Sequence, residues 1–463
     1  MAQPAYQVTD PATGEVVETF PYATDAEVEQ AMADSKAAYA TWSKRPVEER
    51  VAIVKRVAEL FTERAKELAG LITTEMGKRP SQAEGEAAFC TDIFGYYADN
   101  GPSLIADKPL PGHDGARVEY LPVGPILGVM PWNYPYYQVA RFAAPNLVVG
   151  NTVILKHAEN CPTSALAIAQ IMKDAGVPDG VYVNLFATHE QVATMIADPR
   201  VRGVSLTGSE RAGTVVAEAA GRNLKKVVLE LGGSDPYIVL DTDDVDAAAE
   251  TAWNTRMENV GQACNSNKRL IVMDDIYDDF VAGLVKRASA LAPREPGDDS
   301  DDKYSPMVSR AAAENLKAQI DDAVSKGATL HVGGEIVDAE FTSAGSAYFA
   351  PAVLTGVTPE MRAFREELFG PVAVVYKVGS DDEAVELANA VDYGLGGAVW
   401  STDEQRAVAV AEQLEVGMAN VNTPAGEGAD IPFGGTKRSG FGRELGPLGI
   451  DEFVNKRLFY VQR

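Results

Sequence analysis

Cysteine is scarce in this chain, with only three among 463 residues. Three scattered cysteines cannot form the disulfide framework of a small secreted protein, so we expect a reducing, cytoplasmic environment. No apolar run reaches membrane-spanning length, because the stretch 143–155 is broken by Asn146 and Asn151. The opening residues MAQPA lack the basic and apolar pattern of a secretion signal.

Positive charge is the second shortage, since 41 Lys and Arg stand against 67 Asp and Glu and give a net charge of −26. Such a chain repels nucleic acid and anionic membranes, so we expect neither as a partner. Any acidic substrate needs a local cationic anchor. The acidic run 298–302 is expected to be a solvated loop, and no metal site is expected.

The order of apolar and polar residues predicts an α/β fold of two or three domains. Over about the first hundred residues we expect helices, with Pro46 at a helix start. From Ile126 onward short apolar runs alternate with helical segments, which predicts a parallel sheet with helices on both faces. The predicted strands are 126–130, 152–155, 182–186, 203–206 and 226–231, and a second unit of this kind follows Gly233 to about Asn422.

Cys264 closes the turn NVGQAC, residues 259–264, between a predicted helix at 244–258 and a predicted strand at 269–273. A substrate can reach a cysteine at such a connection, and connections carry chemistry more often than the elements they join. The alternative is a small buried apolar side chain, the common state of a free cysteine.

Two other segments contain groups that a cysteine nucleophile would use. Glu230 is a carboxylate inside an apolar run, where burial raises the pKa and suits the group to act as a general base. Its alternative is a cap or a pair with a nearby lysine. Asn133 lies between Pro131 and Pro135, which fix the backbone and can aim its amide at an oxyanion. Its alternative is an ordinary rigid turn.

With these segments and four others, the chain resembles the NAD(P)-dependent aldehyde dehydrogenase family along nearly its whole length. The segments, in the family's order, are PWNYP 131–135, KHAE 156–159, LTGS 206–209, ELGG 230–233, GQAC 261–264, EELFGP 366–371, and PFGG 432–435 with SGFG 439–442. The resemblance implies two Rossmann-like parallel-sheet domains, one for the cofactor and one for catalysis, and a small β oligomerisation unit.

The resemblance also divides the chain. A NAD-binding domain is expected over 1–107 and 124–231, with 428–450 returning to it, and a catalytic domain over 232–427. Strands in 108–123 and 451–463 would form the oligomerisation unit, since an unpaired C-terminal strand is an aggregation hazard. We therefore expect a homodimer or homotetramer. The alternative is that the C-terminal strand pairs within its own subunit.

A mechanism follows from the resemblance. The thiolate of Cys264 attacks the aldehyde carbonyl, and the amide of Asn133 and the backbone N–H of Cys264 hold the oxyanion. Hydride transfer to the nicotinamide leaves a thioester, which is hydrolysed by water that Glu230 activates. A glutamate at position 230 favours release of a free acid over transfer to CoA. Ser266, where some relatives have a second cysteine, predicts no local disulfide switch.

The turn 206–213 predicts a strand, a glycine turn and a helix start, where backbone N–H groups favour a pyrophosphate. The resemblance assigns Gly208 and Ser209 to the pyrophosphate, and Lys156 and Glu159 to the adenosine ribose. Because a carboxylate at Glu159 would repel a 2′-phosphate, we expect NAD to be preferred, with Lys156 leaving room for NADP. The other cofactor positions that the resemblance implies are Trp132, Leu231, Gly232, Glu367 and Phe369.

The substrate prediction depends on Arg141, eight residues after Asn133. A guanidinium binds a carboxylate through two parallel hydrogen bonds, and here the chain resembles bacterial succinic semialdehyde dehydrogenases. The alternative is a surface arginine paired with an acidic neighbour. The chain departs from many of these enzymes in having Glu258 where they place an arginine. Tyr134 and Phe433 are expected to line the substrate tunnel, or else to be core aromatics.

The sequence therefore predicts oxidation of succinic semialdehyde, or of a similar short ω-carboxy aldehyde, to the acid. A broad aliphatic or aromatic aldehyde dehydrogenase with a structural Arg141 is one alternative, and acyl-CoA formation is another. A non-catalytic protein on the same fold is a third, and the intact Cys264, Glu230 and Asn133 argue against it.

Overall fold

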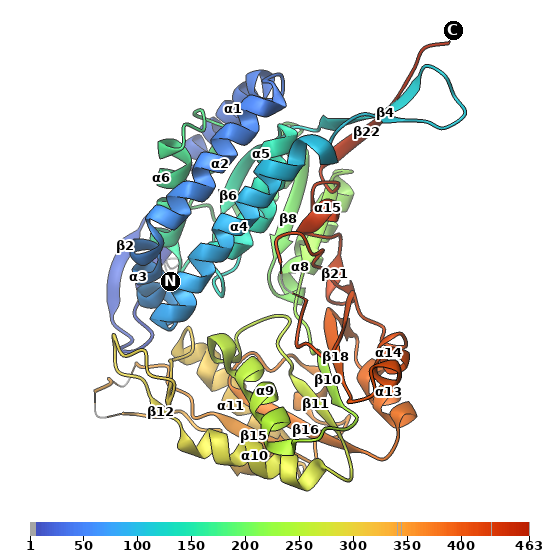
Figure 1. Cartoon of the computed structure of the whole chain (residues 1–463). Helices are drawn as coiled ribbons and strands as arrows, with labels where there is room; N and C mark the ends of the chain where they lie inside the picture. Colours follow the sequence, from blue (N-terminus) through green and yellow to red (C-terminus); the bar gives the residue numbers. More distant parts are fainter. Residues whose placement is uncertain (1–5, 340, 344, 427, 463) are drawn as a thin grey trace.

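Two sheets, each covered by helices, organise the computed structural model, which describes residues 6–339, 341–343, 345–426 and 428–462. Figure 1 shows one sheet with its helices in the upper half of the view and the other in the lower half. The α/β fold with two parallel-sheet units is confirmed. Residues 1–5, where we expect no secretion signal, lie outside the described residues. No described helix is both long and apolar enough to cross a membrane.

The first sheet has six strands in the order β21-β9-β8-β5-β6-β7, all parallel except β21. They are β5 (Pro125–Val129), β6 (Thr152–Lys156), β7 (Tyr182–Asn184), β8 (Gly203–Thr207), β9 (Lys226–Glu230) and β21 (Gly440–Phe441). All five predicted strands are present. Ile126 packs into one apolar cluster and Leu127 into another, so both faces of the sheet are buried. Burial on both faces explains the continuous apolar runs.

Helices precede and connect these strands. They are α1 (Asp25–Trp42), α2 (Val47–Glu63), α3 (Ala65–Met76), α4 (Pro80–Leu104), α5 (Tyr137–Val149), α6 (Pro162–Asp174), α7 (His189–Ala197) and α8 (Glu210–Arg222). Helix α2 begins directly after Pro46, as predicted. A hairpin of β1 (Tyr6–Thr9) and β2 (Val16–Phe20) comes first, so the prediction of helices throughout the first hundred residues is wrong there. Strand β2 is short and largely exposed, and such a strand leaves no apolar periodicity to detect.

The second sheet has seven strands in the order β14-β15-β16-β11-β10-β18-β19, and only β14 is antiparallel to its neighbour. Its strands are β10 (Pro236–Val239), β11 (Arg269–Met273), β14 (Thr329–Val332), β15 (Ala352–Thr355), β16 (Val372–Val378), β18 (Gly396–Trp400) and β19 (Met418–Val421). Its main helices are α9 (Val245–Met257), α10 (Tyr277–Ala290), α11 (Arg310–Ser325), α13 (Asp381–Asn389) and α14 (Glu404–Ala411). Short elements complete the set: β12 (Ala292–Pro293), β13 (Lys303–Tyr304), α12 (Arg362–Arg365), β17 (Tyr393–Gly394), β20 (Thr436–Lys437) and α15 (Gly446–Gly449).

A third, small sheet extends away from the two larger units (Figure 1). It consists of β3 (Lys108–Pro109), β4 (Ala116–Pro122) and β22 (Val454–Tyr460), all antiparallel, in the order β22-β4-β3. The C-terminal strand therefore pairs within its own chain, which is the alternative stated above. Strand β22 still has an open edge, and its Leu458 side chain is exposed. Oligomerisation through this sheet stays a prediction.

The acidic run 298–302 is a largely exposed loop, as predicted, and two of its carboxylates also form ion pairs. Asp299 and Asp301 both form ion pairs with Arg79, at 2.9 and 2.6 Å. The Asp299 carboxylate also accepts a hydrogen bond from the hydroxyl of Ser81, at 3.0 Å. The run thus holds the second unit against the start of α4. Sequence reasoning missed this because the partners are more than two hundred residues away.

Candidate active site

The predicted cofactor residues gather at the carboxyl edge of the first sheet. The chain passes from β5 to β6 on one side and later places β8 on the other side of β5. Open α/β sheets bind ligands where the strand order reverses in this way. The segments after these strands contain Trp132 beyond β5, Lys156 at the end of β6, and Gly208 and Ser209 beyond β8.

Contacts among the other predicted cofactor residues bring distant segments together. The rings of Trp132 and Phe369 meet edge to face with centroids 5.6 Å apart. Gly232, next to Leu231, lies directly against the carboxylate of Glu367, which would have to shift to admit a side chain there. Ser209 caps α8 by accepting a hydrogen bond from the backbone N–H of Ala212 at 3.3 Å. These residues fit a dinucleotide, with the first turn of α8 open to a pyrophosphate.

Lys156 and Glu159 form an ion pair, with 2.5 Å between Nζ and Oε1. His189 Nε2 lies 3.5 Å from the same carboxylate oxygen. Burial alone would raise the pKa of Glu159, but the Lys156 ammonium outweighs it and lowers the pKa. A cofactor phosphate would therefore meet a paired carboxylate, not an isolated negative charge.

The loop that carries Cys264 is held by buried cations. It leaves α9 through the 3₁₀ turn Glu258–Gly261, in which Asn259 and Val260 have positive φ. The guanidinium of Arg256 donates hydrogen bonds to the carbonyls of Gly261 and Gly370, at 3.1 and 2.7 Å. These contacts fix an otherwise strained turn.

Past the turn, a second cation holds the loop. Lys268 Nζ donates to the Cys264 carbonyl at 2.7 Å and lies 3.0 Å from the Glu367 carboxylate. Lys268 therefore joins the nucleophile loop to the predicted nicotinamide-ribose residue. Both cations fix the position of Cys264 before any substrate binds.

The Cys264 side chain borders a cavity of about 660 Å³ between the two large units. Burial raises the pKa of its thiol to about 11, and Arg141 and Lys268 oppose that rise. The resting group is therefore a thiol, which would have to lose its proton to act as a nucleophile.

Asn133 is buried beside the nucleophile loop. Its Nδ2 donates to the carbonyl of Gln262 at 3.0 Å, and Asn259 donates to the Asn133 carbonyl at 3.0 Å. These bonds hold the Asn133 amide against Gln262, which lies two residues before Cys264 in the sequence. The second hydrogen on Nδ2 is the one that an oxyanion could accept.

Glu230 ends strand β9 with 1% of its surface exposed. Neither carboxyl oxygen has a hydrogen-bond partner among the described residues. Burial raises its pKa well above the usual value, and the nearby Glu444 carboxyl raises it further. The pairing with a lysine that was the alternative does not occur among the described residues. A buried, unpaired carboxyl group is what a general base of raised pKa requires.

Arg141 is completely buried in α5. Its Nε lies 2.7 Å from Glu444 Oε2, and its Nη2 donates to Gln138 at 2.5 Å. The guanidinium sits between the rings of Tyr137 and Phe433, at 4.7 and 4.5 Å from their centroids. It does have an acidic partner, as the alternative reading held, but in the interior and not on the surface.

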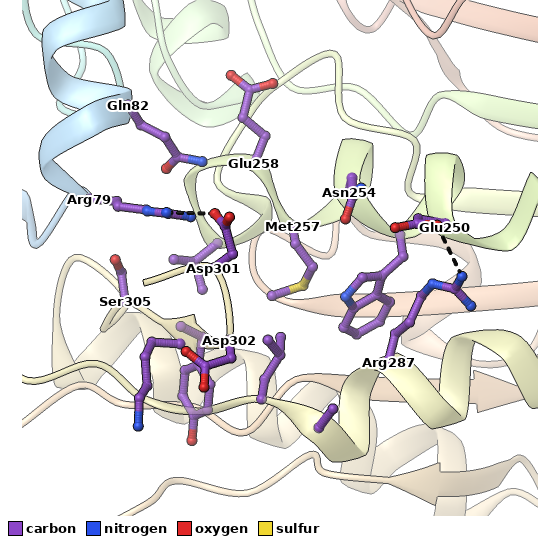
Figure 2. A pocket seen from close by; sticks show the side chains of 16 residues that line it. Arg79, Gln82, Glu250, Asn254, Met257, Glu258, Arg287, Asp301, Asp302 and Ser305 are labelled. Atoms are coloured by element: carbon purple, nitrogen blue, oxygen red, sulfur yellow. Dashed lines mark hydrogen bonds and ion pairs between the residues drawn. The ribbon is translucent and has the colours of Figure 1, made fainter. Parts of the chain in front are cut away.

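Tyr134 and Phe433 line the cavity beside Cys264, as expected of tunnel residues. The Tyr134 hydroxyl donates to the carboxylate of the exposed Glu258 at 3.0 Å. In Figure 2, which shows a neighbouring pocket, the Glu258 carboxylate is turned away from the Arg79–Asp301 pair. Glu258 therefore lies at the boundary between that pocket and the cavity, since it borders both.

Sequence reasoning missed several charged residues at the site. Lys78 borders the cavity, with its Nζ 3.7 Å from the Tyr134 ring centroid and 2.5 Å from Glu86. Glu444 partners Arg141, and Lys268 holds the nucleophile loop. No pattern in their own segments marks them, because their roles arise from contacts between distant parts of the chain. No cluster of three or more metal-ligating side chains occurs among the described residues.

Comparisons with known proteins agree with this geometry. Residues 1–458 match the model of the aldehyde dehydrogenase family. A Deinococcus radiodurans protein named succinate-semialdehyde dehydrogenase, NADP(+), is 54% identical over 454 residues, which cover 98% of this chain and 94% of that protein. A Mycobacterium tuberculosis protein of the same name, numbered 1, is 41% identical and covers 98% of both chains.

Solved structures give the same picture. The crystal structure of succinic semialdehyde dehydrogenase from Streptococcus pyogenes in complex with NADP+ superposes with a TM-score of 0.94. It is 40% identical and covers 99% of this chain and 100% of that one. A structure described as giving insights into cofactor and substrate selection by Gox0499 has a TM-score of 0.95 at 43% identity, with 99% and 100% covered.

Proposed function

This chain belongs to the aldehyde dehydrogenase family, and we propose that it oxidises succinic semialdehyde to succinate with NADP as the preferred oxidant. The observation that carries the proposal is the cavity that Cys264 borders, with the unpaired carboxyl group of Glu230 buried nearby. The relatives' names supply the substrate. The alternative of a non-catalytic protein has no support in these features.

Three residues of the chain, Cys264, Asn133 and Glu230, would carry out the steps on the substrate. Cys264 loses its proton and attacks the aldehyde carbon, while the Asn133 amide and the Cys264 backbone N–H hold the oxyanion. The nicotinamide, when bound, accepts the hydride. Glu230 then takes a proton from water, and the hydroxide releases the acid from the Cys264 thioester. Losing one oxyanion donor typically costs about 10² to 10³ in rate, which sets the scale expected for Asn133.

The expected preference for NAD finds no support in the relatives, which are named for NADP(+). We propose that NADP is accepted because Lys156 pairs with Glu159. The ammonium neutralises the carboxylate that would repel a 2′-phosphate. The nearby His189 ring can add a donor. An unpaired Glu159 would repel the 2′-phosphate, whereas the Lys156-paired carboxylate repels it less.

For the carboxylate end of the substrate we propose Arg141 as the anchor. Its Nε and Nη2 are taken by Glu444 and Gln138, but Nη1 has only a 3.3 Å bond to the Tyr137 hydroxyl. Arg141 does not itself border the cavity, whereas Tyr137 does, so a substrate carboxylate would reach Nη1 only after Tyr137 moves. Lys78 also borders the cavity, but Glu86, which borders it too, neutralises its charge.

A substrate panel tests the proposal. Reduced-cofactor formation is measured with succinic semialdehyde, hexanal and benzaldehyde, each with NAD and with NADP, and with and without CoA. A kcat/KM at least tenfold higher for succinic semialdehyde supports the proposal. A preference for neutral aldehydes would contradict succinic semialdehyde as the substrate, while the assignment to the family would remain. A dependence on CoA would replace hydrolysis by acyl transfer.

A further inference from the structure

Arg256 is a fully buried cation in the last turn of α9, and it forms no ion pair with a described residue. Burial lowers its pKa to about 9, so the guanidinium stays charged at neutral pH. All five of its N–H groups donate to protein oxygens at 2.7 to 3.1 Å: Nε to Val372, Nη1 to Gly261 and Ser266, and Nη2 to Leu368 and Gly370. Burying a cation without a counter-charge costs free energy, and these five hydrogen bonds offset it.

The five acceptors belong to two segments that carry different parts of the predicted chemistry. Two of them lie in the nucleophile loop, one on each side of Cys264 in the sequence. The other three lie in the segment 368–372, which includes Phe369 and directly follows Glu367, the two predicted nicotinamide residues. One planar guanidinium, anchored on a helix, therefore joins the nucleophile loop to the cofactor segment.

The two segments also touch each other directly at Gly261. Its φ is +71°, and a Cβ added there would collide with the carbonyl group of Gly370. Because this neighbour is backbone and not the end of a flexible side chain, it cannot turn aside, and glycine permits the close approach. The spacing between the two segments is thus set by backbone contact and by the rigid fork of Arg256.

We propose that Arg256 is a positioning residue for hydride transfer. The inference rests on the proposed function, in which Cys264 holds the substrate carbon on its Sγ and the segment with Glu367 and Phe369 holds the nicotinamide. In this step the C–H bond of the thiohemiacetal breaks, and the hydrogen leaves with both electrons for the nicotinamide. The oxyanion re-forms the carbonyl, so the carbon is oxidised to a thioester. Because a misplacement of about 1 Å can cost about 10² in rate, a link that sets the spacing of the two segments controls this step.

A purely structural role is the alternative, and Arg269 provides the matched control. Its side chain is buried in the same unit, at 1% exposed, and forms no ion pair with a described residue. Its guanidinium donates to the carbonyls of Leu387 and Ala388, and to neither of the two segments. Arg256→Lys and Arg269→Lys each keep the charge but lose the planar fork, since an ammonium has only three donors.

Single-turnover kinetics isolate the step. Protein saturated with NADP or NAD, whichever binds more tightly, is mixed with the aldehyde that the substrate panel favours, with ¹H or ²H on the aldehyde carbon. For Arg256→Lys we expect the rate constant for cofactor reduction to fall roughly ten- to a hundredfold, with a deuterium isotope effect at least as large as that of wild type. Arg269→Lys should keep the wild-type values. The rate constant does not depend on the folded fraction, so lost stability alone cannot mimic this result.

Two measurements do not depend on turnover. In the cofactor-free protein, Arg256→Lys should speed amide hydrogen exchange in peptides spanning 261–266 and 368–372, whereas Arg269→Lys should speed it only around 387–390. Calorimetric titration should give a cofactor affinity near that of wild type, because Glu367 keeps its pairing with Lys268.

Ser266→Ala is the milder variant, since it removes only one acceptor of Arg256. It should lower the hydride-transfer rate constant about three- to tenfold. If Arg256→Lys does not fold, Ser266→Ala decides alone. An unchanged rate constant in the folded variants overturns the inference, as does an equal loss in Arg269→Lys or a loss that disappears at saturating cofactor. A panel that favours another aldehyde would contradict the proposed substrate and leave this test intact.

Discussion

The guanidinium of Arg141 and the carboxylate of Glu444 form an ion pair in the interior, with 2.7 Å between Nε and Oε2. The pair acts electrostatically on two candidate catalytic groups. Arg141 opposes the rise in pKa of both Cys264 and Glu230, whereas Glu444 raises that of Glu230. Arg141 therefore influences the ionisation of both candidate catalytic groups, Cys264 and Glu230.

The first prediction concerns Arg141→Gln. Loss of the cation should raise the pKa values of Cys264 and Glu230, so the acid limb of the pH–rate profile moves to higher pH. It should also lower the preference for succinic semialdehyde over hexanal by roughly ten- to a hundredfold, the range for a hydrogen bond to a charged group. Steady-state kcat/KM for both aldehydes between pH 6 and 9 measures both effects.

Because Arg141→Gln leaves a buried carboxyl unpaired, the double variant Arg141→Gln with Glu444→Gln is the control for folding. If the double variant folds and keeps the wild-type substrate preference, Arg141 is not the carboxylate anchor. If it loses both aldehydes equally, the role is structural.

Glu230→Gln should separate the two halves of the reaction. The thioester should form but hydrolyse slowly, because the amide cannot take a proton from water. Rapid mixing is expected to show a burst of about one reduced cofactor per active site, followed by slow turnover. Cys264→Ala is the matched control and should show no burst. A Glu230→Gln variant with wild-type turnover and no burst would assign the base to another residue.

For the cofactor, Glu159→Gln should favour NADP further. The variant removes the carboxylate but leaves the Lys156 ammonium free to face a 2′-phosphate. Calorimetric titration of each cofactor should show the ratio of the NAD to the NADP dissociation constants rising roughly tenfold. The matched variant Lys156→Gln should move the same ratio the other way. Unchanged ratios in both would place the 2′-phosphate elsewhere.

Asp235 provides a test of stability against pH. Burial raises its pKa to about 7, with Lys268 opposing, whereas an unfolded aspartate has a pKa of about 3.9. The folded state thus holds its proton more tightly, so Asp235 costs stability as pH rises from about 4 to about 7. Asp235→Asn should gain up to roughly 4 kcal/mol over wild type across this window. Denaturant midpoints at pH 5 and pH 8 measure it, and an equal difference at both pH values would contradict the assignment.

The oligomer prediction rests on the open edge of β22. Leu458 is 62% exposed there, and Leu458→Lys should dissociate an assembly that uses this strand. Val16→Lys is the matched control, since Val16 is 55% exposed on β2, which belongs to a separate sheet at the other end of the molecule (Figure 1). Light scattering after size exclusion gives the mass of each. An unchanged mass for Leu458→Lys would exclude β22 from the interface.

Much of the fold could be read from local patterns. Both faces of each parallel sheet are buried, so strands such as 125–129, with the sequence PILGV, are continuous apolar runs that stand out from their surroundings. The turn around Cys264 and the proline-bounded Asn133 could be singled out from the sequence, because this chemistry needs particular residue types within short segments. The exposed strand β2 was missed because its sequence contains no periodic burial.

The sequence by itself determined the alternation of strands and helices and the family, and it singled out Cys264 and Glu230 as candidate nucleophile and base, since each signal lies in short local segments. Tertiary structure alone decided that Arg141 meets Glu444, that Lys156 neutralises Glu159, and that the C-terminal strand pairs with β4. Charges of opposite sign attract at a few ångströms whatever their separation in sequence. Only folding brings such partners that close, and their pairing sets the electrostatics of the site.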